Sequence, residues 1–386
     1  MTNDYVIGVH PGLSAVDADA WNRLLAQQRD ATPFMRHEYL HALEHSGSAV
    51  ASTGWTAKVF TLHRQGVLQA ATVLYVKPHS YGEYVFDWAW AQAYEQHGLS
   101  YYPKAVVAVP FTPVPGARLL ALDADARVAL VQTLVGWCQA QGLSSLHLLF
   151  GNADDLAACE ACGLMLRNTV QFHWHNQRSP GPFADFEDFL RQLSQDKRKK
   201  IRQERRKVAE AGVRFRSACG RDIAEADWQF FYRCYARTYR EHGNPPYLSP
   251  DFFARMSRTL PQAWLMFIAE RDGRAIASSL IGLEGDQGLA YGRYWGALER
   301  VDCLHFEACY YQPIEWCIAH GFARFEGGAQ GEHKMARALM PARTHSAHWL
   351  AHPAFADAVQ RFLEREGHGV DVYLEHLDER SPFRRD

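Results

Sequence analysis

The sequence has no apolar run near the roughly 18 residues that a membrane-spanning helix requires, and it shows no basic segment followed by an apolar stretch at its start. We therefore predict a cytoplasmic protein with no membrane span. The chain also has little net charge, with a formal value of -2. It does not attract nucleic acid or an anionic membrane as a whole, so any anionic partner must be bound by a local basic segment.

Metal-binding patterns are also missing. The eight cysteines are scattered, and the close pair Cys159 and Cys162 lacks the further ligands of a structural zinc site. His345 and His348 are spaced to chelate from a helix, but no third ligand accompanies them. We predict no metal.

The composition is that of a large globular protein. Apolar residues make up 47% and aromatic residues 13% of 386 residues, which excludes disordered and fibrous classes. Because domains usually contain roughly 100 to 200 residues, the length predicts two domains.

A weak internal repeat supports this division. Residues 63–76, "HRQGVLQAATVLYV", match residues 270–283, "ERDGRAIASSLIGL", and both patterns are typical of a hairpin with a glycine turn. The tetrads "YGEY" at 81–84 and "YGRY" at 291–294 follow in the same order at nearly the same offset. We predict that both tetrads lie on equivalent central strands of a duplicated α/β domain.

The order of elements after the repeat is also similar in the two halves. Each half continues as strand, helix, strand and short helix, and Pro313 is expected to kink or break the helix of the second half. The segment from Pro180 to Gly212 separates the halves and is predicted to be a basic helical linker. The predicted domains are an N-terminal GNAT-like domain at 1–179, the linker at 180–212, and a C-terminal GNAT-like domain at 213–386.

Four long strings carry a family resemblance: "SYGEYVFDWAWA" at 80–91, "KRKKIRQERRK" at 197–207, "HFEACYYQPIEWCI" at 305–318, and "RFEGGAQGEHKMARALMPARTHSAHWL" at 324–350. With the predicted order of elements, the chain resembles the FemAB-like acyltransferases of tandem GNAT architecture over about residues 31 to 376. It is most similar to the bacterial branch called GNAT or peptidoglycan biosynthesis/recognition proteins. The resemblance implies an α/β fold with two mixed sheets and N-acyl transfer as the reaction class.

The chain departs from ordinary GNAT enzymes in one place. Those enzymes hold the pyrophosphate of coenzyme A on a glycine-rich turn at a helix N-terminus. The second half has "ERVDCLHF" there, with the acids Glu299 and Asp302, which would repel a pyrophosphate. The first half is closer to the pattern, with Gly116 and Arg118 ahead of a helix. FemAB-type enzymes, which use aminoacyl-tRNA, resemble this chain in lacking an intact turn.

The stretch "EGGAQGEHK", residues 326–334, is the densest group of reactive side chains. It lacks the Gly-Lys-Ser/Thr sequence of a phosphate loop, because Lys334 precedes a methionine. It follows a predicted strand, and strand ends are where ligand crevices form in open α/β sheets. We predict a cleft with a general base among Glu326, Glu332 and His333; the alternative is a polar bend that only caps the next helix.

Further side chains are candidates for substrate binding. Alternation along the strand predicts Tyr291 and Arg293 on one face and Tyr294 on the other. The complete set of predicted substrate-binding residues is Tyr291, Arg293, Tyr294, His305, Glu307, Gln330, Lys334, Tyr81, Tyr84 and Asp87.

Eight of the eleven residues in 197–207 are basic, and like charges four positions apart oppose helix formation. The run therefore indicates an anionic partner, which can be coenzyme A, tRNA or an anionic glycan. The predicted cofactor-binding residues are Gly116, Arg118, Lys199, Lys200 and Arg202.

Three functions fit these patterns. The first is an N-acyltransferase that uses acyl-CoA, such as acetyl-CoA, and a small-molecule or peptide amine as acceptor. The second is an aminoacyl-tRNA-dependent transferase that binds tRNA through the basic helix and acts on a cell-wall precursor or peptide. The third is a non-catalytic protein that recognises such a ligand. The sequence leaves the oligomeric state open.

Overall fold

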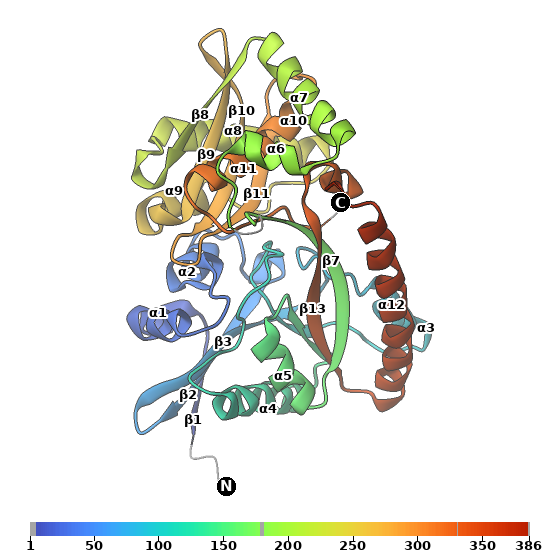
Figure 1. Ribbon diagram of the computed structural model, residues 1–386. Helices are drawn as coiled ribbons and strands as arrows, with labels where there is room; N and C mark the ends of the chain where they lie inside the picture. The colour runs from blue at the N-terminus through green and yellow to red at the C-terminus, as the bar shows by residue number, and fades with distance from the viewer. Residues whose placement is uncertain (1–4, 178–180, 330, 385–386) are drawn as a thin grey trace. The chain divides into compact units, whose positions relative to one another are not determined.

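The computed structural model describes residues 5–177, 181–329 and 331–384 (Figure 1). The chain forms two compact units, each discontinuous in sequence. Unit 1 comprises Met1–Thr169 and Arg343–Val372, and unit 2 comprises Val170–Ala342 and Tyr373–Asp386. The helices at 186–210, which the sequence predicted as part of a linker, lie within unit 2.

Unit 1 is an α/β unit built on a mixed sheet. The strands follow the order β1 (Val6–His10), β2 (Thr56–Arg64), β3 (Val67–Lys77), β4 (Lys104–Val107), β6 (Ser145–Leu149) and β13 (Met340–Leu350), and β5 (Leu120–Ala121) pairs with β3. Only β4 and β6 are parallel in this set. The helices are α1 (Ala18–Ala26), α2 (His37–His45), α3 (Trp88–Gln96), α4 (Ala124–Ala140), α5 (Ala153–Ala161) and the first part of α12 (Pro353–Glu379).

Unit 2 repeats this arrangement. Its strands follow the order β7 (Met165–His175), β12 (Arg324–Glu326), β11 (Leu289–Ala297), β10 (Arg274–Glu284), β9 (Trp264–Arg271) and β8 (Val213–Cys219), and β11 and β12 are parallel. The helices are α6 (Phe186–Gln192), α7 (Gln195–Glu210), α8 (Glu225–Glu241), α9 (Pro250–Thr259), α10 (Leu304–Phe306) and α11 (Gln312–Ala319).

The two predicted hairpins are confirmed. β2 pairs with β3 and β9 pairs with β10, both antiparallel. Each turn places a non-glycine residue and then a glycine in the left-handed region, with φ of 52° and 78° at Gln65 and Gly66 and of 51° and 71° at Asp272 and Gly273. Two consecutive left-handed residues are what a tight hairpin with a native twist requires.

The two tetrads are not equivalent. "YGRY" lies on β11 as predicted, but "YGEY" lies in the loop between β3 and α3, so its assignment to a strand was wrong. Gly82 and Tyr84 have φ of 82° and 61°, which a strand does not allow. In addition, Lys104 holds Glu83 inside the unit at 2.8 Å.

The last strand of each half pairs in the sheet of the other half. Within unit 1, β13 from the end of the chain pairs with β6, from Ser346 with Leu149 to Leu350 with Ser145. Within unit 2, β7 from the first half pairs with β12. This exchange explains why both units are discontinuous in sequence.

The helix of the second half changes its hydrogen bonding where Pro313 was expected to disturb it. A π-helical turn at Glu307–Tyr311 joins α10 to α11, and Pro313 lies in the first turn of α11. Proline has no N–H to donate to the carbonyl four residues earlier, which favours a local rearrangement of this kind. The turn carries Cys309 and Tyr310, which line the cavity described next.

Candidate active site

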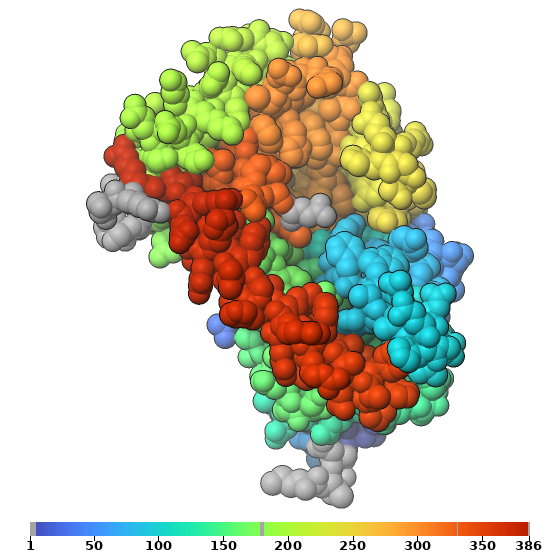
Figure 2. Space-filling view, turned by 90° about the vertical axis from the view of Figure 1, so that its right-hand side faces the viewer, coloured from blue at the N-terminus to red at the C-terminus, as the bar shows by residue number. Residues whose placement is uncertain are grey.

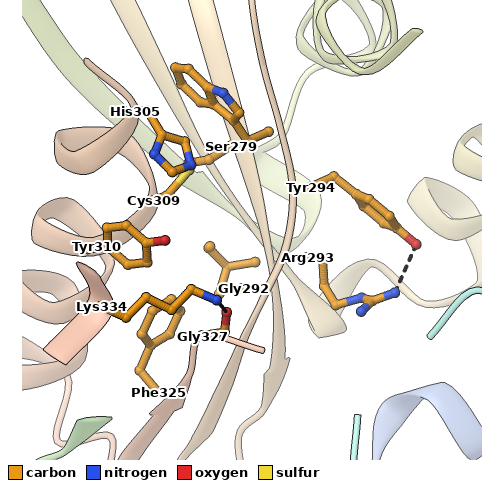
Figure 3. Close-up of a pocket in the computed structure, with 12 residues that line it drawn as sticks. Ser279, Gly292, Arg293, Tyr294, His305, Cys309, Tyr310, Phe325, Gly327 and Lys334 are labelled. Carbon is orange, nitrogen blue, oxygen red and sulfur yellow. Dashed lines mark hydrogen bonds between the residues drawn. The ribbon is translucent and has the colours of Figure 1, made fainter. Parts of the chain in front are cut away.

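A cavity of about 210 Å³ lies in unit 2 where the parallel strands β11 and β12 separate (Figure 3). The two strands pair from Leu289 with Arg324 to Tyr291 with Glu326. β12 then ends, while β11 continues to Ala297. The cavity is lined by Ser279, Ile281, Gly292, Arg293, Tyr294, Trp295, His305, Cys309, Tyr310, Phe325, Gly327 and Lys334.

A β-bulge lies on β11 at the cavity. Pairing with β10 shifts between Leu280 with Tyr294 and Ile281 with Gly292, so Arg293 is the extra residue. Figure 3 shows Arg293 and Tyr294 on the same side of the strand, and an Arg293 nitrogen donates to the Tyr294 hydroxyl at 3.0 Å. The predicted alternation of these two residues was therefore wrong, because the bulge interrupts it.

On the other side of β11 the cavity is lined by His305 and Tyr310, and His333, which is not among the lining residues, contacts Tyr310. Burial, reinforced by His333, Arg337 and Lys334, lowers the pKa of His305 to about 4. Burial and the cations Arg337, Lys334 and Lys200 also lower the pKa of His333. The Tyr310 hydroxyl lies 3.4 Å from Nε2 of His333. A neutral imidazole beside a phenol can accept a proton near neutral pH.

Lys334 organises the loop that the sequence singled out. Its ammonium group donates to the carbonyls of Gly327 at 2.7 Å, Gly328 at 3.3 Å and Ala329 at 2.8 Å, and burial lowers its pKa to about 8. Lys334 thus lines the cavity and also closes the turn after β12. Gln330 lies outside the described residues.

Glu326 lies at the same strand end but on the opposite face of the sheet from Phe325, which lines the cavity. Its carboxylate pairs with Arg324 at 2.9 Å and lies 3.8 Å from Nε2 of His173. Burial, with Arg324 as the next cause, lowers the pKa of His173 to about 3, so this imidazole is neutral. Tyr291 is the cross-strand neighbour of Glu326 in the parallel pair.

Two other predicted carboxylates lie away from the cavity lining. Glu332 is half exposed, pairs with Arg380 at 3.0 Å and accepts a hydrogen bond from Tyr373 at 3.3 Å. Glu307 is buried and accepts hydrogen bonds from Arg205 at 3.1 Å and Gln312 at 2.8 Å.

The basic helix α7 has an inner and an outer side. On the inner side, Glu204 accepts two hydrogen bonds from Arg337, at 2.9 and 2.8 Å, and one from the Tyr311 hydroxyl. Arg337 also stacks on Phe306, with its guanidinium 3.5 Å from the ring centroid. These contacts attach α7 to both chain segments that border the cavity.

On the outer side, α6 and α7 form a basic groove of about 560 Å³. Lys199 and Arg202 belong to it, whereas Lys200 is close enough to His333 to lower the pKa of that imidazole. The lining residues of this groove are Arg191, Gln195, Arg198, Lys199, Arg202 and Arg206.

The candidates of the first half lie in unit 1. Arg118 is buried, and its guanidinium donates to backbone carbonyls, including those of Leu149 at 3.1 Å and Gly116 at 3.2 Å. Asp87 is buried against Lys104, while Tyr81 and Tyr84 are exposed. In unit 2, the turn that replaces the glycine-rich pattern is tied by an ion pair between Glu299 and Arg271.

Three of the cavity residues that sequence reasoning did not select carry a hydroxyl or thiol group. Ser279 was treated as part of a hairpin strand, and Cys309 and Tyr310 were not selected. Tyr310 is buried in the core with Ile314 and Cys317, and it also lines the cavity. The signal in the sequence was Pro313, because the π-helical turn before it carries both Cys309 and Tyr310.

Among residues 5–177, 181–329 and 331–384, no group of three or more His, Cys, Asp or Glu side chains is placed to hold a metal ion. Within the same ranges, no helix is long and apolar enough to cross a membrane.

Three solved structures with a similar fold span most of this chain. The fold is similar to that of FemX, with a TM-score of 0.54 and 10% identity over 89% of this chain and 98% of that one. It is also similar to the C-terminal domain (DUF2156) of a putative lysylphosphatidylglycerol synthetase from Agrobacterium fabrum (TM-score 0.53, 10% identity, 89% and 95% covered). A third similar structure is L-PGS from Bacillus licheniformis (TM-score 0.52, 9% identity, 90% and 97% covered).

A search of curated protein sequences found no match. The FemAB_like family, described as peptidoglycan biosynthesis/recognition, matches residues 12–385. This match spans nearly the whole chain, and the protein belongs to the FemAB-like family.

Proposed function

We propose that the protein is an N-acyltransferase that moves an acyl group from an acyl-CoA donor to an amine. The observation that carries the proposal is the separation of β11 from β12 after Tyr291, with a cavity bordered by His305 and Tyr310. A thioester in this opening lies along the β11 backbone, beside imidazole and phenol groups. Membership of the FemAB-like family supports acyl transfer as the reaction class.

The reaction needs no covalent enzyme intermediate. The amine nitrogen attacks the thioester carbonyl carbon, the C–S bond breaks, and the thiolate of coenzyme A leaves and takes up a proton. The amine gives its proton to a base, which contributes about 10²- to 10⁴-fold to the rate. His333 is the base on the cavity side and Glu326 is the base on the opposite side of the strand end. The Tyr310 hydroxyl is a donor for the developing oxyanion.

Isothermal titration with acetyl-CoA tests the donor. We expect binding by the wild type, weaker binding by Cys309→Trp, which fills the cavity, and unchanged binding by Cys162→Trp, a half-buried cysteine outside it. No heat of binding for acetyl or longer acyl donors, with or without candidate amines, would refute the proposal.

Once an acceptor is known, single substitutions show which of the two candidate side chains is the general base. We expect turnover to fall about 10²-fold or more in the variant that removes the base, either His333→Ala or Glu326→Gln. Glu332→Gln should change turnover little, because Glu332 is paired with Arg380 away from the cavity lining. Full activity in both His333→Ala and Glu326→Gln would show that the loop is a polar bend without a catalytic role.

The basic groove on α6 and α7 favours a second candidate, in which aminoacyl-tRNA is the donor. This candidate predicts tRNA binding that weakens steeply with salt, since each neutralised phosphate releases counterions. Reversing Lys199, Lys200 and Arg202 should weaken binding and reduce the salt slope. Arg23→Glu, an exposed charge reversal on α1, is the matched control. Binding of tRNA that is independent of salt would contradict this candidate.

A further inference from the structure

Unit 1 displays an aromatic ridge, which we define as Tyr81, Phe86 and Trp88. These side chains are 60%, 57% and 43% exposed, and the rings of Tyr81 and Trp88 lie in edge contact with centroids 5.4 Å apart. Large aromatic groups usually contribute to a core, and several together at a surface indicate a binding site.

The loop that carries the ridge is folded with its polar side chains inward. Lys104 donates to Ser80 at 2.7 Å and to Glu83 at 2.8 Å, and it also pairs with Asp87; all four side chains are buried. Burying these charges costs free energy that apolar residues in the same places would not. Stability alone therefore does not explain why these polar side chains are buried. With them inside, the aromatic rings of the loop are exposed at the surface.

An apolar groove of about 490 Å³ adjoins the ridge between α3 and the first half of α12. Figure 2 faces this surface, with the region of α3 in cyan beside the start of α12 in red. Aliphatic and aromatic side chains form the walls, and the polar groups among its described lining residues are those of His97, His352 and the Trp90 indole. No charged carboxylate, ammonium or guanidinium group is among those lining residues.

The size and chemistry of this groove indicate the kind of ligand that fits it. Its volume is within the range of about 300 to 1,000 Å³ for small-molecule pockets. Its walls offer few hydrogen-bonding groups, which suits an aliphatic chain because such a chain forms no hydrogen bonds. Trp and Tyr, which have an apolar body and a polar edge, favour the headgroup region of a bilayer. Trp88 is the first residue of α3, and Ala89, Trp90 and Ala93 of the same helix line the groove, so the ridge adjoins one end of the groove's α3 wall.

We propose that unit 1 docks on a phospholipid bilayer, with one lipid acyl chain in the groove and the aromatic ridge in the headgroup layer. Attachment is apolar, so it does not depend on anionic lipid. Salt therefore should not weaken this attachment, whereas it would screen any electrostatic attraction between the basic groove on α7 and anionic lipid.

Co-sedimentation of the full-length protein with neutral phosphatidylcholine vesicles in about 0.5 M salt tests the proposal. We expect the wild type to bind, and Phe86→Ser and Trp88→Ser each to weaken binding about tenfold or more, as removal of one buried aromatic side chain implies. Val67→Ser is the matched control, because Val67 is also 57% exposed but lies in the β2–β3 hairpin. It should bind like the wild type.

A second pair of variants tests the groove itself. Ala358→Asp places a charge in the groove and should weaken vesicle binding, whereas Ala157→Asp, at an exposed alanine of α5, should not. Circular dichroism confirms that each variant is folded. Failure of the wild type to bind neutral vesicles overturns the proposal, as does binding that requires anionic lipid and disappears in salt. Equal binding by Ala358→Asp and the wild type also overturns it.

Discussion

The buried ion pair between Glu204 and Arg337 gives the most quantitative prediction. The side chains are 10% and 2% exposed, and the pair is joined by two hydrogen bonds, at 2.9 and 2.8 Å. Arg337→Met leaves the carboxylate of Glu204 buried with the Tyr311 hydroxyl as its remaining partner in this cluster. Breaking a buried pair in this way costs about 3–5 kcal/mol, so unit 2 should be destabilised by that amount.

The double variant Glu204→Met/Arg337→Met removes both charges and should recover most of this loss, because buried pairs are often replaceable by apolar residues of similar volume. Hydrogen exchange at the amides of α7 and of Glu332–Arg337 measures the change in the free energy of opening. The reasoning is refuted if Arg337→Met lowers that free energy by less than about 1 kcal/mol, or if the double variant is less stable than the single one.

Three further predictions follow from single residues. Gly296→Ala should be strongly destabilising, because a Cβ there would lie 2.1 Å from the Cys234 carbonyl oxygen. Gly285→Ala should be tolerated, because a Cβ at that position has no atom within 4 Å. Urea unfolding compares the stabilities of the two variants. Because burial lowers the pKa of Lys334 from 10.5 to about 8, the unfolded state binds more protons between these values, and stability should rise with pH across this window. Lys334→Met should remove that rise in urea midpoints measured at several pH values. Turnover should rise with pH through a value below 6.5, the ordinary pKa of His333, and this limb should be absent in His333→Ala.

Local patterns in the sequence were sufficient for the elements whose geometry is local. The Asp272–Gly273 turn predicts its own hairpin, because two left-handed residues in sequence allow few other structures. The strand Leu289–Ala297 and the reactive loop after Glu326 were also predictable from pattern and position. The loop conformation of "YGEY" was not predictable, because it depends on the contact of Glu83 with Lys104, which lies more than twenty residues later in the sequence.

Other features depend on contacts distant in sequence. The exchange of β7 and β13 between the two units leaves no local trace in the sequence, because the backbone groups of a strand can pair with the edge strand of either unit. The position of Tyr310 depends on a π-helical turn, and that of Arg293 on a β-bulge, and both alter the regular spacing on which the predictions of faces relied.

The measurement that tests the central claim most directly is hydrogen exchange of the full-length protein with and without acetyl-CoA. If the donor lies where β11 and β12 separate, amides of Tyr291–Ala297 and of the π-helical turn at Glu307–Tyr311 should become protected, and Cys309→Trp should abolish the effect. Protection confined to other segments, or none at saturating acetyl-CoA, would contradict the assignment of this cavity as the acyl-donor site.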